Sequence, residues 1–197
     1  MAFLELVKDV ARDTSFAVFG GSVPMGVNQD VYKVLVQIAA AGGAKAVVDA
    51  DGEALVEAIK SKPFMIKPNR EEAERLLDTQ FESKTDVARA ALKLAEFDIP
   101  LVIISLGAQG AVACYEGQVY DAVPPKVDAV STIGSGDSMV AGVLCALEND
   151  KKIEYALRLG CAAGAATAMS NGADIGQKQD VDTLLKDTKV TRVRLKD

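Results

Sequence analysis

The 197-residue sequence contains no histidine and no tryptophan, and only 5% of its residues are aromatic. Without histidine, the chain has neither Ser-His-Asp nor Cys-His catalysis, and it has no His-ligated metal site. Basic residues are also scarce, because 22 Lys and Arg stand against 28 Asp and Glu, for a net charge of −6. Binding to a nucleic-acid backbone needs a cationic face, so we expect no nucleic-acid partner. If a substrate carries phosphates, particular groups at its binding site must bind them, because the chain as a whole is acidic.

Cysteine and long apolar runs are also in short supply. Cys114, Cys145 and Cys161 are widely spaced in apolar surroundings, which fits neither a zinc knuckle nor a disulfide framework. Residues 1–9 mix acids and bases with apolar residues, unlike a signal peptide, and no apolar run approaches membrane-spanning length. We therefore expect a reduced, cytoplasmic protein with no membrane partner. Apolar residues make up 49% of the chain, enough for a full core.

Short β-rich runs alternate with segments of helical period, a rhythm typical of an α/β fold with a mostly parallel sheet. Residues 110–115 and 118–122 flank Glu116-Gly117 and predict an antiparallel hairpin at the sheet's edge. No linker or repeat interrupts the sequence, which predicts one domain over residues 1–197. The predicted strands are 16–19, 45–49, 64–67 and 101–105. The predicted helices are 3–12, 29–41, 53–60, 70–77, 86–97, 137–148 and 153–170.

One segment between a β-like run and a helix has the composition of an anion-binding loop. It reads Ser131-Thr132-Ile133-Gly134-Ser135-Gly136-Asp137-Ser138-Met139. Two glycines around a small residue leave consecutive backbone N–H groups exposed at a helix start, where the dipole also favours an anion. No Gly-Lys-Ser/Thr follows, so it is not a Walker loop. It is not the dinucleotide fingerprint either, because Met139 stands where a third glycine belongs.

Asp137 is the residue of this segment with acid–base chemistry. Beside an anion hole formed by Gly134, Ser135 and Gly136, its carboxylate is placed to accept a proton from an attacking hydroxyl. The alternative is structural, because glycines before a helix are common and the dipole alone favours Asp in a first turn. The segment by itself does not decide between the two.

Two further segments each follow a predicted strand. Ser105 to Gly110 is a small-residue loop that a nucleotide could approach closely, or an ordinary turn into the hairpin. Lys67-Pro68-Asn69-Arg70-Glu71-Glu72 places a cation, an amide and carboxylates within one turn, or is simply a capped acidic helix. In a parallel sheet, segments that follow strands gather at one edge, which is the usual ligand crevice.

With these segments in view, the sequence resembles the PfkB group of ribokinase-like carbohydrate kinases over about residues 4–187. It is most similar to the 1-phosphofructokinase branch, with tagatose-6-phosphate kinases nearby. Residues 134–137 resemble the family's C-terminal signature, and residues 105–110 its Ser/Thr-x-Gly-x-x-Gly nucleotide segment. Lys67 to Glu72 resemble the segment that acts around ATP phosphates and Mg²⁺. Residues 21–24 and 49–52 resemble two segments beside the cleft.

The resemblance implies a ribokinase-like three-layer α/β/α fold and an ATP-dependent carbohydrate kinase. It implies phosphoryl transfer to a phosphorylated ketohexose, fructose 1-phosphate to fructose 1,6-bisphosphate, with ATP and Mg²⁺. Asp137 would be the general base, and Gly134, Ser135 and Gly136 the anion hole. The implied cofactor-binding residues are Lys67, Asn69, Ser105, Leu106, Gly107, Ala108, Gln109, Gly110, Gly136, Asp137, Cys161 and Ala165. The implied substrate residues are Gly21, Ser22 and Asp137. The implied metal residues are Glu72, for Mg²⁺ through water, and Ser131, Ser170 and Gly172, for potassium.

Parts of the family pattern have no counterpart in the sequence. A complete member also has an early sugar-binding Asp, a Gly-Gly-x-x-x-Asn motif and a β-sheet lid. The resemblance therefore covers roughly the C-terminal two thirds, with the N-terminal part and lid missing. A homodimer is expected only of the full-length family form. Ser131 stands where many relatives have Asp, which the resemblance attributes to the phosphofructokinase branch.

Three hypotheses stay open at this point. The first is a kinase of phosphorylated ketohexoses with Asp137 as base. The second is a non-catalytic nucleotide-binding fragment, motivated by the missing acceptor motifs. The third is another ribokinase-like kinase, acting on tagatose 6-phosphate, a nucleoside or a vitamin.

Overall fold

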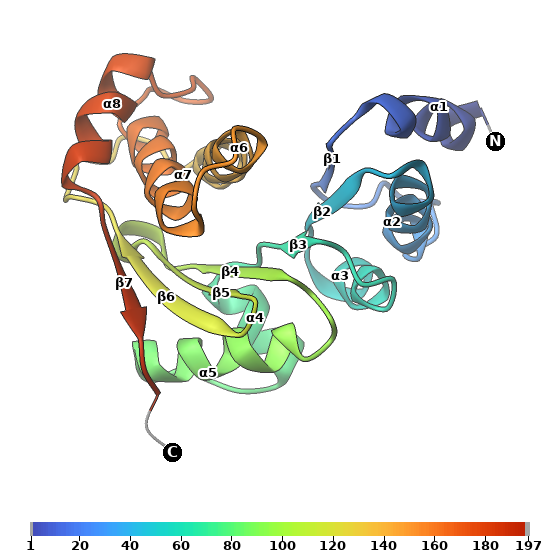
Figure 1. Cartoon of the computed structure of the whole chain (residues 1–197), viewed down its shortest axis with the longest axis horizontal. Helices are drawn as coiled ribbons and strands as arrows, with labels where there is room; N and C mark the ends of the chain where they lie inside the picture. Colours follow the sequence, from blue (N-terminus) through green and yellow to red (C-terminus); the bar gives the residue numbers. More distant parts are fainter. Residues whose placement is uncertain (1, 196–197) are drawn as a thin grey trace. The chain divides into compact units, whose positions relative to one another are not determined.

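The computed structural model describes residues 2–195 as an α/β structure with a mixed, open sheet of seven strands, ordered β1 to β7 as in the sequence. Figure 1 shows the strands with the helices that connect them. The described chain divides into two compact units. Unit 1 is Met1–Ile104 with Cys114–Gly117, and unit 2 is Ser105–Ala113 with Gln118–Asp197.

Unit 1 is built on parallel strands. Its strands are β1 (Phe16–Gly20), β2 (Lys45–Asp49), β3 (Met65–Ile66) and β4 (Leu101–Ser105), and β1 pairs with β2, β2 with β3 and β3 with β4, all in parallel. Strands buried on both faces are continuously hydrophobic, and all side chains from Leu101 to Ile104 are fully buried. The carboxyl ends of β1, β2 and β3 therefore meet at one edge.

The helices of unit 1 connect these strands. They are α1 (Ala2–Val10), α2 (Val31–Gly42), α3 (Gly52–Ile59), α4 (Arg70–Leu77) and α5 (Lys84–Ala95), with a short 3₁₀ helix at Ala11–Asp13. Gly43 ends α2 with a φ of 92°, the left-handed conformation that glycine adopts without strain. Helix α2 packs on α1 and α3, and α4 packs on α3 and α5.

Unit 2 combines antiparallel strands with two closely packed helices. Its elements are a 3₁₀ helix at Gly107–Gln109, β5 (Ala111–Tyr115), β6 (Gln118–Val123), α6 (Ser135–Glu148), α7 (Ile153–Ala168), α8 (Lys178–Asp187) and β7 (Lys189–Val193). Helices α6 and α7 approach so closely that a Cβ on Gly142 would lie 2.9 Å from the Cα of Gly160. The small residues of these helices are therefore required by packing.

The predicted elements agree with the structure up to α7, within a few residues at their ends. Glu116 and Gly117 both have positive φ, as a two-residue hairpin turn requires. The hairpin does not supply the outermost strand, however, because β7 pairs antiparallel with the outer side of β6. Neither α8 nor β7 was predicted, since α8 has no buried residue and β7 reads Lys-Val-Thr-Arg-Val.

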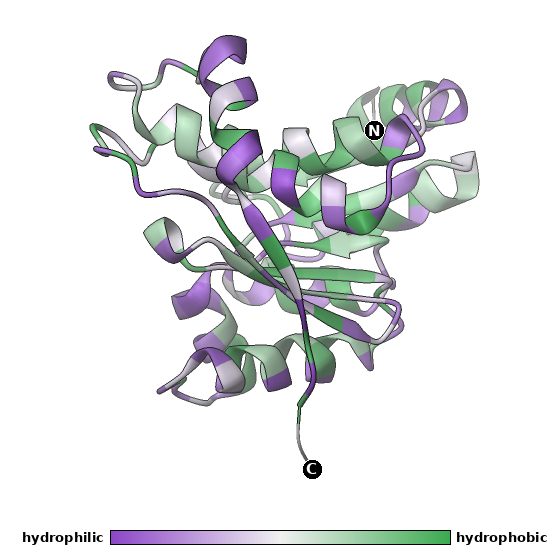
Figure 2. Ribbon diagram, turned by 60° about the vertical axis from the view of Figure 1, so that its left-hand side comes forward, coloured by the Kyte–Doolittle hydropathy of each residue, from purple (hydrophilic) through white to green (hydrophobic). Residues whose placement is uncertain are grey.

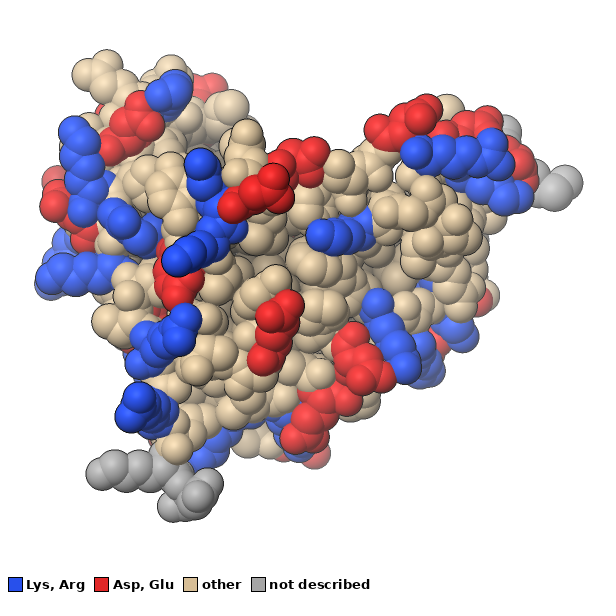
Figure 3. Space-filling model, viewed as in Figure 1, with Lys and Arg blue, Asp and Glu red and all other residues tan. Residues whose placement is uncertain are grey.

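The surface and the interior follow the expected division of polarity. Figure 2 shows mostly hydrophobic central strands and helices that alternate between hydrophobic and hydrophilic residues. On the face shown in Figure 3, acidic and basic side chains are interspersed. Among the residues that the structure describes, no helix is both long and apolar enough to span a membrane.

Candidate functional site

The loops that follow β1, β2 and β3 line a pocket of about 530 Å³ in unit 1. Its walls include Gly21, Ser22 and Val23 after β1, the segment 49–54 after β2, and Glu72 in the first turn of α4. These three loops are brought together because parallel strands present their carboxyl ends at the same edge. The pocket therefore unites the predicted substrate residues Gly21 and Ser22 with the predicted Mg²⁺ residue Glu72.

Lys67 is a buried cation at the end of β3. Only 6% of its side chain is exposed, and its Nζ lies 3.1 Å from Oδ1 of Asp49, at the end of β2. Burying a charge is costly unless it is paired, so the ion pair with Asp49 compensates the buried ammonium group. The pair places one positive and one negative group at the strand ends beside the pocket, since Asp49 lines its wall.

The β1 loop is fixed by backbone and tyrosine contacts. The N–H of Gly21 donates to the carbonyl of Asp49 at 3.0 Å. The hydroxyl of Tyr32 lies 2.9 Å from the carbonyl oxygen of Gly20 and 3.0 Å from that of Gly21. Burial raises the pKa of Tyr32, and the negative charge of Asp49 raises it further. The hydroxyl therefore stays protonated and keeps donating to this loop.

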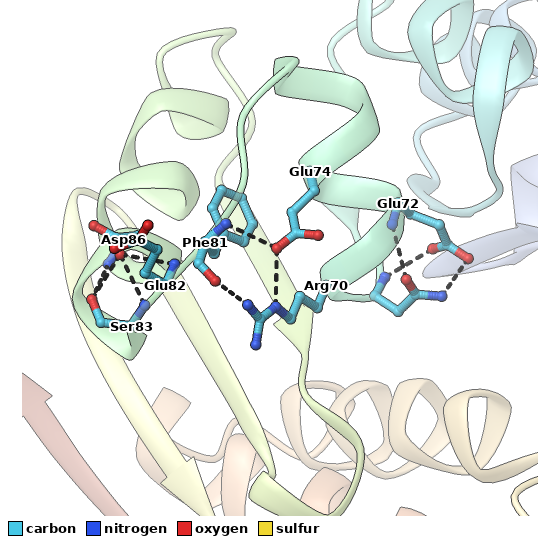
Figure 4. Close-up of polar contacts among 8 residues, drawn as sticks. Arg70, Glu72, Glu74, Phe81, Glu82, Ser83 and Asp86 are labelled. Atoms are coloured by element: carbon cyan, nitrogen blue, oxygen red, sulfur yellow. Dashed lines mark hydrogen bonds and ion pairs between the residues drawn. The ribbon is translucent and has the colours of Figure 1, made fainter.

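Asn69 and Glu72 form a reciprocal capping box at the start of α4. The N–H of Glu72 donates to Oδ1 of Asn69 at 2.9 Å. In return, the Glu72 carboxylate accepts from the N–H of Asn69 at 2.8 Å and from its Nδ2 at 2.6 Å. Figure 4 shows these contacts at the start of α4, with Glu72 labelled. Asn69 therefore fixes the orientation of a carboxylate that lines the pocket.

The surroundings of Glu72 disfavour its charge. Burial raises the pKa of Glu72, the hydrogen bond from the Asn69 backbone lowers it, and the charge of Asp51 raises it. Lys67 and Asp49 then act in opposite directions, and the net effect is a raised pKa. Asp51 accepts from the N–H of Gly52 at 2.6 Å and pairs with Arg75 at 2.7 Å. Carboxylates concentrated in one pocket are a favourable setting for a cation.

In unit 2, α6 begins inside the predicted anion-binding segment. Gly134 is the N-cap residue with a φ of 74°, and Ser135, Gly136 and Asp137 form the first turn. The N–H of Ser135 donates to the carbonyl of Thr132 at 3.2 Å, so it is already engaged. The N–H groups of Gly136 and Asp137 lie in the first turn of α6, where the helix itself has no carbonyl four residues earlier to accept from them. The Asp137 side chain is exposed in this turn.

Two loops of unit 2 meet beside this helix start. The hydroxyl of Ser131 donates to the carbonyl of Gly172 at 2.8 Å. The N–H of Ser131 donates to the carbonyl of Ala168 at 3.2 Å. The hydroxyl of Ser170 donates to the carbonyl of Ala166 at 3.4 Å. The three residues predicted to bind potassium thus lie close together, but Ser131 and Gly172 use their oxygens to bind each other.

Residues 105–110 form a compact turn. The N–H of Leu106 donates to the carbonyl of Gly110 at 2.8 Å, and the N–H of Gly110 donates to that of Gly107 at 3.0 Å. A Cβ on Gly110 would lie 2.0 Å from the carbonyl oxygen of Ala122, so only glycine fits there. Gly107, Ala108 and Gln109 are exposed. The turn therefore presents small exposed groups at the end of β4, where a nucleotide was predicted.

The two residues predicted on α7 differ in exposure. Cys161 is buried, and its Sγ contacts the carbonyl oxygen of Ala122 at 3.8 Å. Its side chain is therefore directed toward β6. Ala165 is half-buried, one turn further along the helix. The assignment of both residues to a nucleotide pocket stays a prediction.

Comparison with known proteins identifies the family. The model of the pfkB family carbohydrate kinases matches residues 2–180. The chain belongs to the PfkB family. The 1-phosphofructokinase of Bacillus subtilis is 35% identical over 98% of this chain and 62% of its own length, and that of Borreliella burgdorferi is 33% identical over 91% and 57%.

Solved PfkB structures show the same fold. A phosphofructokinase structure from Staphylococcus aureus superposes with a TM-score of 0.87 at 31% identity, covering 96% of this chain and 62% of its own. The phosphofructokinase-2 of Escherichia coli, in complex with potassium, gives 0.86 at 28% identity, covering 93% and 61%. The chain thus spans about three fifths of the length of these relatives.

The PfkB family implies Mg²⁺ and ATP, and the donors of unit 1 fit such a metal. Mg²⁺ keeps several waters and needs few protein carboxylates, and the pocket offers Glu72, Asp49 and Asp51. Within residues 2–195, no group of three or more Cys, Asp or Glu side chains is arranged to hold a metal ion, and the role of Glu72 toward Mg²⁺ stays a prediction.

Two contributors were missed from the sequence. Asp49 was grouped with a family segment, but its ion pair with Lys67 was not predicted, because pairing across neighbouring strands depends on their register. Thr167 was missed entirely. It is buried in α7 and contacts the first turn of α6, and an isolated Thr in an Ala-rich helix carries no sequence signal.

Proposed function

We propose that this chain carries the ATP-dependent phosphoryl-transfer machinery of a sugar-phosphate kinase of the 1-phosphofructokinase type. The observation that carries the proposal is the start of α6, where Gly136 and Asp137 offer helix N-terminal N–H groups next to an exposed carboxylate. The relatives support a sugar phosphate as the acceptor of the phosphoryl group, because those at 30–35% identity are 1-phosphofructokinases.

Asp137 acts as the general base in this proposal. Its carboxylate takes the proton of the attacking sugar hydroxyl, whose oxygen forms the new bond to the γ-phosphorus of ATP. The bond from that phosphorus to the β,γ-bridging oxygen breaks, and ADP leaves with the electron pair. The N–H groups of Gly136 and Asp137 stabilise the charge on the transferring oxygens, a role typically worth several kcal/mol.

The residues of unit 1 manage phosphates and metal. Mg²⁺, when bound, neutralises charge on the ATP phosphates. Glu72, oriented by Asn69, would hold the metal through its water ligands, and the pocket wall at Gly21 and Ser22 is assigned to the sugar phosphate. Lys67 keeps a fixed positive charge at the strand ends through its pair with Asp49.

Potassium is not part of the proposed machinery. The relative from Escherichia coli has a structure in complex with potassium. In this chain the three predicted ligands are two hydroxyls and a carbonyl, and the Ser131 hydroxyl donates to the Gly172 carbonyl. A hydrogen bond therefore joins the two loops here.

The test is ³¹P NMR of the chain with Mg-ATP and one acceptor at a time. We expect the γ-phosphoryl signal to move to fructose 1-phosphate, with fructose 6-phosphate and tagatose 6-phosphate as slower acceptors. Transfer only to tagatose 6-phosphate or to a nucleoside would show that this compound, and not fructose 1-phosphate, is the acceptor. ATP binding without transfer to any acceptor would favour a non-catalytic nucleotide-binding role and contradict the proposal.

A further inference from the structure

Thr167 has unusual surroundings for a polar residue. Among the residues that the structure describes, the buried polar or charged ones are Lys67, Thr167 and Thr188. Only 2% of Thr167 is exposed, and its hydroxyl donates to Oγ of Ser138 at 2.7 Å while accepting from the N–H of Gly176 at 3.0 Å. The hydroxyl thus uses its donor and one of its two acceptor positions within the protein.

The contacts of Thr167 lie at both ends of the segment that starts α6. Its hydroxyl bonds to Ser138, the residue after Asp137. Its methyl group lies near the N-cap residue, since a Cβ on Gly134 would come within 3.7 Å of Cγ2 of Thr167. One side chain therefore contacts the residues on either side of the Ser135–Asp137 turn.

Helix α7 supports the same turn from a second position. A Cβ on Gly164 would lie 3.0 Å from the carbonyl oxygen of Ser135, so α7 passes close beneath the first turn of α6. Gly176, whose N–H donates to the Thr167 hydroxyl, lies with Gly172 in the loop between α7 and α8. That loop is joined to Ser131 by the hydrogen bond to the Gly172 carbonyl. Hydrogen bonds thus connect Thr167 directly to α6 and to the loop that holds Gly172 and Gly176, and that loop is bonded in turn to Ser131.

We propose that Thr167 is a positioning residue, whose hydroxyl fixes the first turn of α6 so that Gly136 and Asp137 face the transferring phosphoryl group. The inference rests on the proposed kinase function. Preorganised donors stabilise a transition state only if they are held in place before the reaction, and small displacements lower the rate strongly. Ground-state binding of ATP depends less on this alignment, so Thr167 acts mainly on kcat.

The chain offers a matched control. Thr188 is 3% exposed in the same unit, and its hydroxyl donates to the carbonyl of Leu184 at 2.8 Å, at the end of α8. Thr167→Val and Thr188→Val each remove one buried hydroxyl and keep the side-chain shape. Thr167→Val also removes the hydrogen bond from Gly176. We expect it to lower kcat about tenfold with KM for ATP within about twofold, because the lost hydrogen bond to Ser138 alone corresponds to a factor of about ten.

Rescue by a hydroxyl separates positioning from packing. Thr167→Ser keeps the hydroxyl and loses only the methyl, so its kcat should return to within about threefold of the parent. Thr188→Val should leave kcat within about twofold of the parent at a comparable loss of thermal stability. Equal kcat losses in the two Val variants, or a Thr167→Ser variant as slow as Thr167→Val, would overturn the inference.

Hydrogen exchange gives a readout that does not depend on turnover. Amides of residues 131–138 should exchange faster in Thr167→Val, at the parent rate in Thr167→Ser, and at the parent rate in Thr188→Val. Unchanged exchange in Thr167→Val contradicts the positioning role whatever the activity. A parent chain that shows no turnover but has the expected exchange pattern contradicts the kinase proposal alone.

Discussion

The capping box at the start of α4 leads to a quantitative prediction about Glu72, the carboxylate proposed to face the metal. Changing Asn69 to Ala removes the acceptor for the Glu72 N–H and the donor to its Oε1. Loss of an N-cap side chain costs about 1 kcal/mol, and the second hydrogen bond, to a partly buried carboxylate, adds about 0.5 kcal/mol. We expect Asn69→Ala to lower unfolding stability by about 1.5 kcal/mol and Tm by about 3–6 °C.

A second capping box supplies the control. Ser83 caps α5 with the same pair of bonds, since its Oγ accepts from the Asp86 N–H at 3.3 Å and donates to the Asp86 carboxylate at 2.8 Å. Figure 4 shows Ser83 and Asp86 in the same close-up as Glu72. Asp86 is not among the residues that line the pocket. Ser83→Ala should therefore destabilise unit 1 without touching the proposed site.

The assay compares turnover of the two variants below their melting temperatures. Asn69→Ala should lose about 10–100-fold in Mg-ATP-dependent turnover, because residues that orient a metal-site carboxylate typically contribute that much. Ser83→Ala should stay within about twofold of the parent, because its helix end carries no functional group. If both variants lose the same factor, the stability loss explains the effect and the role of Asn69 in holding Glu72 is refuted.

Three further predictions concern single groups. Ser135→Ala should stabilise the chain by about 1 kcal/mol in urea unfolding, because the Ser135 hydroxyl is buried without a partner; a loss of stability would contradict this. In NMR titrations of the metal-free chain, Glu72 should have a pKa above that of an ordinary Glu. Its charge therefore destabilises the fold at neutral pH, and this destabilisation is lost as the pH falls from the raised pKa toward the ordinary one. Asp51→Asn should lower that pKa, and an unchanged titration would exclude the charge effect. Replacing potassium with sodium should change kcat less than about twofold, since the Ser131 hydroxyl already joins its loop to Gly172; a tenfold loss would indicate a cation site.

Much of the fold could be predicted because its signals are local. The run Leu101–Ile104 is continuously apolar, as a strand buried on both faces must be, and it is a strand with fully buried side chains. Asn69 was predicted to cap the helix that follows it, and it does. The start of α5 was placed two residues late because the pairing of Ser83 with Asp86 was overlooked. Elements α8 and β7 have too few buried residues to show a clear period.

The sequence named candidate residues for the site, but it did not predict the contacts among them. The family resemblance placed residues 21–24 beside the ligand cleft and Glu72 near the phosphates and Mg²⁺, and the β1 loop and Glu72 line the same pocket. The ion pair of Lys67 with Asp49 and the contact of Thr167 with Ser138 join residues that are distant in sequence. Such contacts depend on strand register and on the approach of two helices, which local patterns do not specify.

The central claim is that Asp137 is the base for phosphoryl transfer, and one comparison tests it most directly. Asp137 is the third residue of α6, and Asp180 is the third residue of α8, so each sits in the first turn of its helix. Asp137→Asn and Asp180→Asn thus remove the same charge from equivalent helix positions. Initial rates of ADP formation with fructose 1-phosphate and Mg-ATP should fall at least about 100-fold in Asp137→Asn, since general-base catalysis contributes about 10²–10⁴-fold, and stay near the parent rate in Asp180→Asn. An Asp137→Asn variant that phosphorylates fructose 1-phosphate as fast as the parent would contradict the account.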